Sequence, residues 1–342
     1  MSRVNSRSRP TLADVAALAG VARSTASDVI NDAPHMRVGA ETRARVLAAV
    51  EELGYRPNAA ARGLRTQRTQ MFGFLSDDIA ASPFAGETIT GAQEVALASN
   101  HLLLIANTGG DPKVQQAAID AMLDRQIDGL IVAAVSSRRI AVEPLRRVSV
   151  PTVLLNCFGD ESVFPAVIPD DERGGFDAAE LLLDAGHERI ALINGLSWEH
   201  AAGERERGFR RAVEQRGVAV DEELIAKGNW WPDSGYEHTQ RFLEQRDPPT
   251  AIFCANDRMA VGAYQALKER GLRIPDDVSV LGFDDMELAE HLRPALSTLA
   301  LPHYEMGRWA CERLLSEQRE PVCELWPCPP RLRDSVGPPK ER

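Results

Sequence analysis

Thr11-Leu-Ala-Asp-Val-Ala-Ala-Leu-Ala-Gly20-Val-Ala-Arg-Ser-Thr25-Ala-Ser-Asp-Val-Ile-Asn31 is the stretch that decides how this chain begins to fold. Thr11 can cap a helix because its side-chain oxygen accepts a backbone N–H, and Asp14 stands three residues later, at the capping-box position. Gly20 can adopt the positive φ of a tight turn. The stretch therefore predicts two short helices around one turn, which is the helix-turn-helix pattern.

A third helix completes the predicted N-terminal domain. We expect helices from Leu12 to Ala19, from Arg23 to Asn31 and from Ala40 to Leu53, with Gly54 as the final stop. The side chains expected in their shared core recur at helical spacing and are Leu12, Val15, Ala16, Ala19, Val21, Ala26, Val29, Ile30, Val46, Leu47, Val50 and Leu53. These helices predict one small domain, residues 1–56.

Charge separates this domain from the rest of the chain. Residues 1–70 hold 11 arginines, no lysine and 6 acidic residues, whereas the remaining chain holds 28 basic and 44 acidic residues. A basic head on an acidic body is typical of a phosphate-contacting module attached to a domain of another function. Helical pattern alone also fits an ordinary small bundle, so the charge separation is what favours DNA binding.

The second predicted helix offers a polar face for reading DNA. With its apolar residues turned inward, five side chains remain free to face a major groove: Arg23, Ser24, Thr25, Ser27 and Asp28. These side chains are the candidate contacts to bases and phosphates.

Length and composition require further domains. The chain has 342 residues, 44% of them hydrophobic, which suits at least one large core besides the head. The first ten residues are polar and arginine-rich, unlike a signal peptide, and no apolar run is long enough to span a bilayer, so we expect a cytoplasmic protein. Five cysteines without CxxC spacing favour reduced thiols, with a Cys323–Cys328 pair as the alternative.

From Met71 onward, short apolar runs alternate with longer amphipathic stretches. Strands are expected at 71–75, 102–106, 129–133, 152–155, 166–168, 190–193, 251–255 and 278–283. Helices are expected at 88–100, 112–125, 174–185, 205–215, 235–244, 259–270 and 304–318. This alternation predicts an α/β fold with parallel sheets in two subdomains, residues 71–342, and a ligand site in the crevice at the carboxyl ends of the strands.

The chain resembles the lactose-repressor (LacI/GalR) family of bacterial transcription factors along nearly its whole length. The motifs that carry the resemblance are Thr11-Leu-x-Asp-Val-Ala-x-x-Ala-Gly-Val, Thr42-Arg43, Gly54-Tyr-Arg-Pro-Asn58, Ala61-Arg-x-Leu64, Asp128-Gly-Leu-Ile-Val, Gly186-His-x-Arg-Ile190, Arg205-x-x-Gly-Phe209, Pro249-Thr-Ala-Ile-Phe-Cys-Ala-Asn-Asp257, Pro275-x-Asp-Val-Ser-Val-x-Gly-Phe-Asp-Asp285, Arg293-Pro-x-Leu-Ser-Thr298 and Arg333-Asp-Ser335. The resemblance implies a helix-turn-helix head, a hinge and a two-lobed core similar to periplasmic sugar-binding proteins. It adds Thr11, Asn31 and Tyr55 to the candidate DNA contacts.

Residues 57–70 would form the hinge helix and linker. Pro57 ends the preceding element, Asn58 can cap a new one, and the segment is too short for a stable lone helix in water. By resemblance the hinge folds on DNA, where Leu64 of each subunit enters the minor groove and Ala61 allows close approach. The alternative is a plain surface linker with Leu64 against the core.

Three features depart from the family pattern. Asp28 stands where relatives usually carry a donor, and a carboxylate can accept only from a cytosine amino group, which predicts an unusual operator. Ala22 and Gly39 replace frequent capping serines, so two helix caps are lost. The loop of residues 34–38 is also longer than in many relatives.

Carried over by resemblance, seven residues would line a ligand pocket: Asp77, Phe84, Asn156, Arg205, Trp230, Asn256 and Asp284. Carboxylate, amide and guanidinium groups can hold sugar hydroxyls, while an indole face covers the C–H surface of a sugar. Structural roles are the alternatives: Asp284 can cap a loop, Arg205 can pair with a nearby glutamate, and Trp230 can belong to the core.

These observations predict a homodimeric transcriptional regulator, most simply a repressor, that binds a near-palindromic double-stranded operator and answers to a small-molecule effector, a carbohydrate. The sequence contains no Gly-x-Ser-x-Gly, Gly-x-Gly-x-x-Gly, phosphate-loop or His-Glu-x-x-His motif, so we expect no enzyme, cofactor or metal. A periplasmic-type binding protein would need an export signal and no basic head. An effector-independent DNA-binding protein with a vestigial pocket remains the alternative. The lack of a C-terminal leucine heptad favours a dimer over a tetramer.

Overall fold

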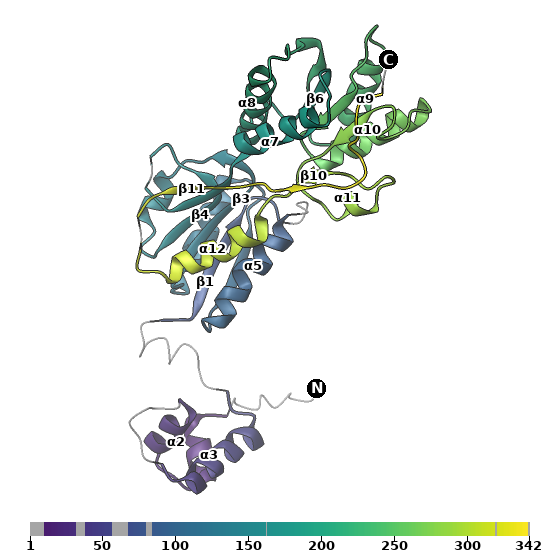
Figure 1. The fold of residues 1–342 in the computed structure, drawn as a ribbon. Coiled ribbons are helices and arrows are strands. Elements are labelled where there is room, and N and C mark those ends of the chain that lie inside the picture. The colour runs from purple at the N-terminus through teal and green to yellow at the C-terminus, as the bar shows by residue number, and fades with distance from the viewer. Residues whose placement is uncertain are drawn as a thin grey trace, which may run out of the picture. The chain divides into compact units, whose positions relative to one another are not determined.

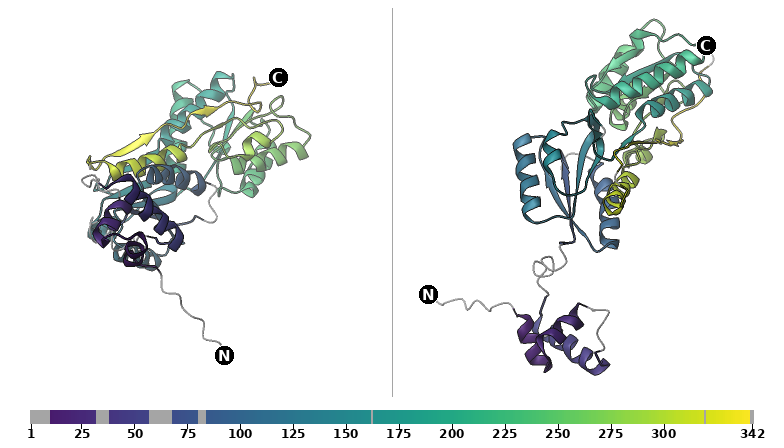
Figure 2. Two further views of the ribbon diagram at one scale, coloured as in Figure 1. Left: turned by 90° about the horizontal axis from the view of Figure 1, so that it is seen from below. Right: turned by 90° about the vertical axis from the view of Figure 1, so that its left-hand side faces the viewer.

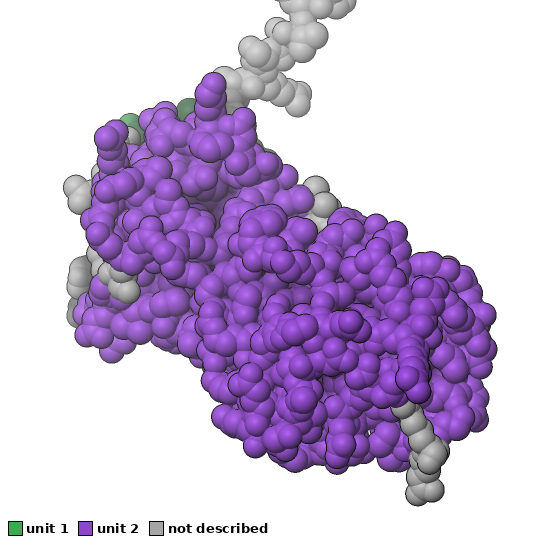
Figure 3. All heavy atoms as spheres, turned by 90° about the horizontal axis from the view of Figure 1, so that it is seen from above, with its two compact units in different colours: residues 1–69 green, residues 70–342 purple. Residues whose placement is uncertain are grey.

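The computed structural model describes residues 10–31, 38–56, 68–79, 84–161, 163–318 and 320–340. The chain divides into two compact units, residues 1–69 and 70–342, which Figure 3 shows in different colours. Within the described residues, no helix is both long and apolar enough to cross a bilayer.

The first unit contains the expected helices α1 (Leu12–Ala19), α2 (Arg23–Ile30) and α3 (Ala40–Leu53). Thr11 and Asp14 form the expected capping box, and Gly20 takes a φ of 64° at the turn. α2 and α3 begin without a side-chain cap, as Ala22 and Gly39 predict.

One expected core position in the head is wrong. Leu47 is 48% exposed, and Ala49 is buried beside Val46 instead. The reason is helical geometry, because a residue three positions after Val46 shares its face whereas the next residue is rotated by about 100°. The predicted hinge residues Asn58, Ala61 and Leu64 lie outside the described residues, as do the loop residues 32–37. Their roles stay predictions.

The second unit consists of two lobes, each a parallel sheet covered by helices on both faces (Figures 1 and 2). The first lobe comprises the described parts of residues 70–169 and 303–326. Its strand order is β11-β5-β4-β3-β1-β2, and all pairings are parallel. The strands are β1 (Met71–Ser76), β2 (Leu102–Asn107), β3 (Gly129–Arg139), β4 (Thr152–Phe158), β5 (Ala166–Pro169) and β11 (Cys323–Trp326).

Two apolar cores lie on the two faces of this sheet. Helices α5 (Ala85–Ala98) and α12 (His303–Leu315) pack together on one face, while α6 (Pro112–Asp124) and the 3₁₀ turn η1 (Glu143–Arg147) cover the other. The right-hand view of Figure 2 shows this sheet edge-on with helices on either side.

The second lobe comprises residues 170–302 and 327–340, and its strand order is β7-β6-β8-β9. The strands are β6 (Ile190–Asn194), β7 (Ile225–Lys227), β8 (Ala251–Cys254) and β9 (Ser279–Leu281). Helices α7 (Asp171–Asp184) and α8 (His200–Gln215) cover one face, and α9 (Pro232–Leu243) and α10 (Asp257–Glu269) cover the other. The 3₁₀ turn η2 (Glu222–Leu224) and the short helix α11 (Leu288–His291) complete this lobe.

The chain passes between the lobes three times, from β5 to α7, from β10 (Thr298–Leu299) to α12, and from β11 to β12 (Pro330–Arg331). β10 and β12 pair in antiparallel fashion at this junction. The sequence analysis did not identify β7, β10, β11 or β12, because strands of two to four residues are stabilised by their partners and carry little periodicity of their own.

Three helix pairs in this unit pack closely at reciprocal glycines. A Cβ atom added to Gly175 would lie 2.1 Å from the carbonyl oxygen of Arg205, and one added to Gly208 would lie 1.9 Å from that of Glu172. The same reciprocity joins α9 to α10 and α5 to α12. In the first of these pairs, the close approach brings the start of α7 against α8.

The observed elements extend beyond several expected ones. β3 continues to Arg139 where we expected its end at residue 133, and α8 begins at His200 where we expected residue 205. Both extensions reach the space between the lobes, where Ser136 and Ser137 of β3 and Ala201 of α8 lie.

Candidate functional site

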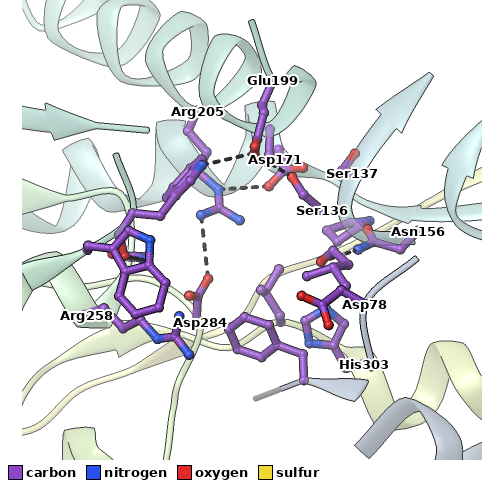
Figure 4. Close-up of a pocket in the computed structure, with 18 residues that line it drawn as sticks. Asp78, Ser136, Ser137, Asn156, Asp171, Glu199, Arg205, Arg258, Asp284 and His303 are labelled. Carbon is purple, nitrogen blue, oxygen red and sulfur yellow. Dashed lines mark hydrogen bonds and ion pairs between the residues drawn. The ribbon is translucent and has the colours of Figure 1, made fainter. Parts of the chain in front are cut away.

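A cavity of about 250 Å³ lies between the lobes (Figure 4). A cavity of this volume can hold several water molecules or a small polar ligand. Its lining residues from the first lobe and the lobe junction are Asp78, Phe84, Val135, Ser136, Ser137, Asn156, Pro169, Leu301 and His303. Those from the second lobe are Asp171, Glu199, Ala201, Arg205, Trp230, Trp231, Asn256, Arg258 and Asp284.

Arg205 of α8 occupies the centre of the second lobe's wall (Figure 4). Its Nε donates to Asp171 Oδ1 at 2.8 Å, and its Nη1 lies 3.6 Å from Asp284 Oδ1. Nη1 also donates to the carbonyl oxygen of Ala255, and the guanidinium stacks 3.7 Å from the Phe283 ring centroid. The side chain is 5% exposed, so these contacts replace water almost completely.

Burial controls the electrostatics of this cluster. Burial opposes the charge of Arg205, but the nearby Asp171 and Asp284 carboxylates outweigh it and raise the pKa of Arg205 above its ordinary value. Burial raises the pKa of Asp284 well above its ordinary value, while Arg205 acts in the opposite direction. Behind Asp284, burial raises the pKa of Asp257 to about 7, although Thr298 Oγ1 and the Met286 N–H both donate to its carboxylate.

The Asp257 shift predicts a pH-dependent stability. A carboxyl whose pKa rises on folding stabilises the fold when protonated, and that contribution is lost as the pH rises through the folded pKa. We expect wild type to lose about 1 kcal/mol of unfolding free energy between pH 6 and pH 8 through this group. In Asp257→Asn the amide oxygen can accept from the Met286 N–H and the amide nitrogen can donate to Thr298 Oγ1, so the variant stays paired and should flatten that loss in urea unfolding curves. An equal loss of unfolding free energy between pH 6 and pH 8 in the two proteins would contradict a raised pKa of Asp257.

Trp230 is held in place on several sides. Its φ is 71°, and its carbonyl oxygen accepts from Asn256 Nδ2 at 3.0 Å. Its Nε1 donates to Glu199 Oε2 at 3.0 Å, and its ring packs on Gly195, where an added Cβ would lie 1.9 Å from a ring carbon. The indole therefore forms a rigid apolar platform beside the charged cluster.

Four buried polar atoms in the cavity wall have no hydrogen-bond partner. They are Ser137 Oγ, Asn156 Oδ1, Asp171 Oδ2 and His303 Nδ1. Burial lowers the pKa of His303 to about 3, so its ring is neutral at pH 7. Because unsatisfied buried polar groups are costly and rare, the occurrence of four among the residues of one wall sets this region apart from the rest of the core.

Six of the seven predicted pocket residues line this cavity, namely Phe84, Asn156, Arg205, Trp230, Asn256 and Asp284. The seventh, Asp77, does not line this cavity but a neighbouring hollow of the first lobe. Its carboxylate pairs with Arg138 at 2.8 Å and accepts from the Val135 N–H at 3.0 Å, away from the cavity. Asp78 lines the cavity instead, because consecutive residues at the end of a strand point to opposite sides.

Several lining residues were missed by sequence reasoning. Asp171 follows the capping residue Asp170 at the start of α7, and two acids at a helix start were the available signal. Glu199 and His303 carried no such signal. Glu199 precedes α8, whose start we expected five residues later, and His303 begins α12, whose start we expected one residue later. Among the described residues, no cluster of three or more His, Cys, Asp or Glu side chains could hold a metal ion.

The second helix of the head presents the expected polar face. Arg23 and Ser24 are exposed, Thr25, Ser27 and Asp28 are half-buried, and Ala26 and Val29 form the inner side. The other three predicted contacts have structural partners. Thr11 caps α1, the Asn31 amide donates to the Ser27 carbonyl oxygen at 2.6 Å, and Tyr55 packs against the head's core.

Two family models match the chain, one within the first compact unit and one within the second. The one described as bacterial regulatory proteins, lacI family, matches residues 11–58, and the one described as a periplasmic binding protein-like domain matches residues 179–336. The ribose operon repressor of Haemophilus influenzae is 36% identical over 311 residues, which are 91% of this chain and 92% of that protein.

Solved structures agree with the sequence matches. The lac repressor dimer bound to operator and the anti-inducer ONPF superposes with a TM-score of 0.81 at 27% identity, covering 96% of this chain and 99% of that one. The complex of the transcriptional regulator CelR with cellobiose gives a TM-score of 0.69 at 30% identity, covering 96% of this chain and all of that one.

Proposed function

This chain belongs to the LacI family of bacterial regulatory proteins, and we propose that it is a dimeric repressor whose affinity for its operator is changed by a sugar bound between its lobes. It is a DNA-binding transcriptional regulator with a ligand-binding core. The observation that carries the sugar proposal is a cavity lined by the Trp230 indole together with four residues that each hold an unpartnered buried polar atom.

The effector chemistry fits a polyol. The Asp171 and Asn156 oxygens can only accept, and a sugar hydroxyl can donate to them while its own oxygen accepts from Ser137. Trp230 offers an apolar face for the C–H surface of a sugar ring. Two similar proteins carry sugar names, the ribose operon repressor and the CelR–cellobiose complex.

The DNA contacts follow from the α2 face. Arg23 suits a phosphate or a guanine edge, while Ser24, Thr25 and Ser27 can donate or accept. Asp28 favours cytosine at one operator position. Thr11, Asn31 and Tyr55 are proposed to contact the DNA backbone. Asn58, Ala61 and Leu64 are proposed to belong to the hinge that enters the minor groove.

The link between sugar and operator runs through the lobes. Three chain crossings join the lobes, and the cavity is lined by residues from both. A ligand that contacts both walls therefore stabilises one arrangement of the two lobes over another. The coupling is reciprocal, because operator DNA must change sugar affinity by the same factor. We propose a cytoplasmic regulator without catalytic activity, in line with the repressor names of its relatives.

The homodimer is proposed to form at the β2 edge of the first lobe. Leu97 at the end of α5 and Leu102 on β2 are 51% and 60% exposed, and β2 has a partner on one side only. Leu102→Glu should shift the protein from dimer to monomer in sedimentation velocity and weaken operator binding on the order of 100-fold, since two heads no longer bind together. Leu325→Glu, on the opposite edge strand β11, should leave the dimer intact.

The direct test is a mobility-shift assay on the DNA upstream of the chain's own gene and its neighbours, with and without mono- and disaccharides. We expect a retarded complex whose affinity changes at least tenfold with one sugar. A complex that no sugar changes would favour the effector-independent alternative. No complex on any fragment at low salt would contradict the regulator itself.

A further inference from the structure

The wall of the cavity is rich in negative charge. Four carboxylates line it, those of Asp78, Asp171, Glu199 and Asp284, against two guanidiniums. Arg205 is already engaged by Asp171 and Asp284. Arg258 stands at the rim, with its guanidinium 4.7 Å from the ring centroid of Trp231, which is 55% exposed. Although burial raises the pKa of Asp284 and disfavours its charge, the remaining carboxylates of the wall oppose an incoming anion.

Six helices of the described residues begin at the cavity, and they differ in how their first turns are arranged. Helices α5, α9 and α12 begin at or next to Phe84, Trp231 and His303 without a side-chain cap, whereas three others carry polar groups at their starts. Backbone N–H groups at a helix N-terminus can bind an anion, but at α7 the Asp170 carboxylate already accepts from the Arg173 N–H at 3.0 Å. At α10 the Asn256 amide oxygen accepts from the Met259 N–H at 2.8 Å. The residue that precedes α8 is itself an acid, Glu199.

Glu199 has a distinctive place among the four acids. Its Oε2 accepts from Ser136 Oγ of β3 at 2.8 Å and from Trp230 Nε1 at 3.0 Å (Figure 4). Ser136 belongs to the first lobe and Trp230 to the second. Beside this bridge, the rings of Phe158 and His200 meet across the lobes at 4.8 Å. One carboxylate thus joins both walls of the cavity.

We propose that Glu199 is the specificity-determining residue of this cavity, and that it admits uncharged polyhydroxylated ligands of monosaccharide size while rejecting their phosphorylated counterparts. This inference rests on the proposed sugar site. A sugar hydroxyl can donate to the Glu199 carboxylate in place of Ser136, whereas a phosphate group at neutral pH carries only acceptor oxygens and nearly two negative charges. Glu199 therefore selects by charge and by hydrogen-bond direction together.

The decisive variant is Glu199→Gln, which keeps the side-chain shape. Its amide oxygen, placed where Oε2 lies, can accept from both Trp230 Nε1 and Ser136 Oγ. Glu204→Gln is the matched control, because it removes the same charge from the same helix. Glu204 pairs with Arg207 and does not belong to the cavity wall.

Binding is measured by calorimetry for D-ribose with D-ribose 5-phosphate, for D-glucose with D-glucose 6-phosphate, and for inorganic phosphate. We expect wild type to bind an uncharged sugar and to reject every phosphorylated probe. Glu199→Gln should improve the affinity for a phosphorylated probe, relative to its uncharged partner, by about tenfold or more. Glu204→Gln should keep the wild-type ratio.

Either of two results would overturn the proposal. One is wild-type binding of a phosphorylated sugar within threefold of its uncharged partner. The other is an absence of any gain in Glu199→Gln over Glu204→Gln, which includes the case in which no probe binds. The same preparations are tested on operator DNA, so that retained DNA binding separates a failure of this inference from a failure of the regulator function.

Discussion

Arg205→Met is expected to destabilise the second unit by about 3–5 kcal/mol, because it leaves the Asp171 and Asp284 carboxylates buried without their shared cation. At roughly 2–3 °C per kcal/mol for a domain of this size, the melting temperature should fall by roughly 10 °C. The loss should be smaller at pH 5 than at pH 8. Protonation of Asp284, whose pKa burial raises, relieves part of this cost, and that relief disappears as the pH rises through its raised pKa.

Arg207→Met is the matched control for this experiment. Arg207 lies two residues further along α8, its side chain is 61% exposed, and it pairs with Glu204, whose side chain is 14% exposed. We expect it to cost less than about 1 kcal/mol, as exposed ion pairs do. If Arg205→Met and Arg207→Met had the same melting temperature at pH 8, the buried cluster would not stabilise the fold as its geometry indicates.

Arg205→Met also separates stability from response. The head is a separate compact unit, so its operator binding should survive at temperatures where the core remains folded. The change of operator affinity with sugar should be lost, since Arg205 lines the cavity and orients Asp171 within it. If sugar changed the operator affinity of Arg205→Met as much as that of wild type in mobility-shift assays, Arg205 would not be part of the binding site.

Gly208→Ala should destabilise the second unit by about 3 kcal/mol, at the upper end of what overpacking costs. The added Cβ would lie 1.9 Å from the Glu172 carbonyl oxygen and 2.6 Å from the Phe176 nitrogen, and both of these are backbone atoms. Helices α7 and α8 must then move apart. Because Asp171 begins α7 and Arg205 belongs to α8, the separation should also weaken the sugar response.

The same helix supplies the control. Gly203 is exposed, and a Cβ added there meets nothing within 4 Å. Gly203→Ala should therefore stabilise the protein by about 0.5–1 kcal/mol, since glycine weakens a helix interior relative to alanine. Chemical denaturation of both variants checks the pair. Equal effects of the two substitutions would mean that the close approach of α7 and α8 is not under strain.

Local patterns were enough to predict the head and the order of the elements. The Thr11–Asp14 capping box, the Gly20 turn and the spacing of Val15, Ala19 and Val46 act over a few residues, so a sequence displays them directly. The alternation of strands and helices likewise predicted two parallel sheets, because each element must bury one face.

The residues of the site were predictable in kind and only partly in place. Arg205, Asp284 and Asn256 came from motif resemblance, and the structure brings them into one cavity wall. Asp78 lines the cavity and Asp77 does not, because a shift of one residue at a strand end reverses the side that a side chain faces.

By itself, then, the sequence determined the helix-turn-helix head and the α/β alternation, since both depend on neighbours within a few positions. The chemical types of the pocket residues came from the resemblance of its motifs to a family. Only the tertiary structure decided which distant groups meet. The Glu199 bridge joins residues 63 and 31 positions apart, and the Arg205–Asp171 pair depends on two glycines that let their helices touch. Such contacts exist because the packed core of the whole unit holds their elements together, and no short stretch of sequence contains that information.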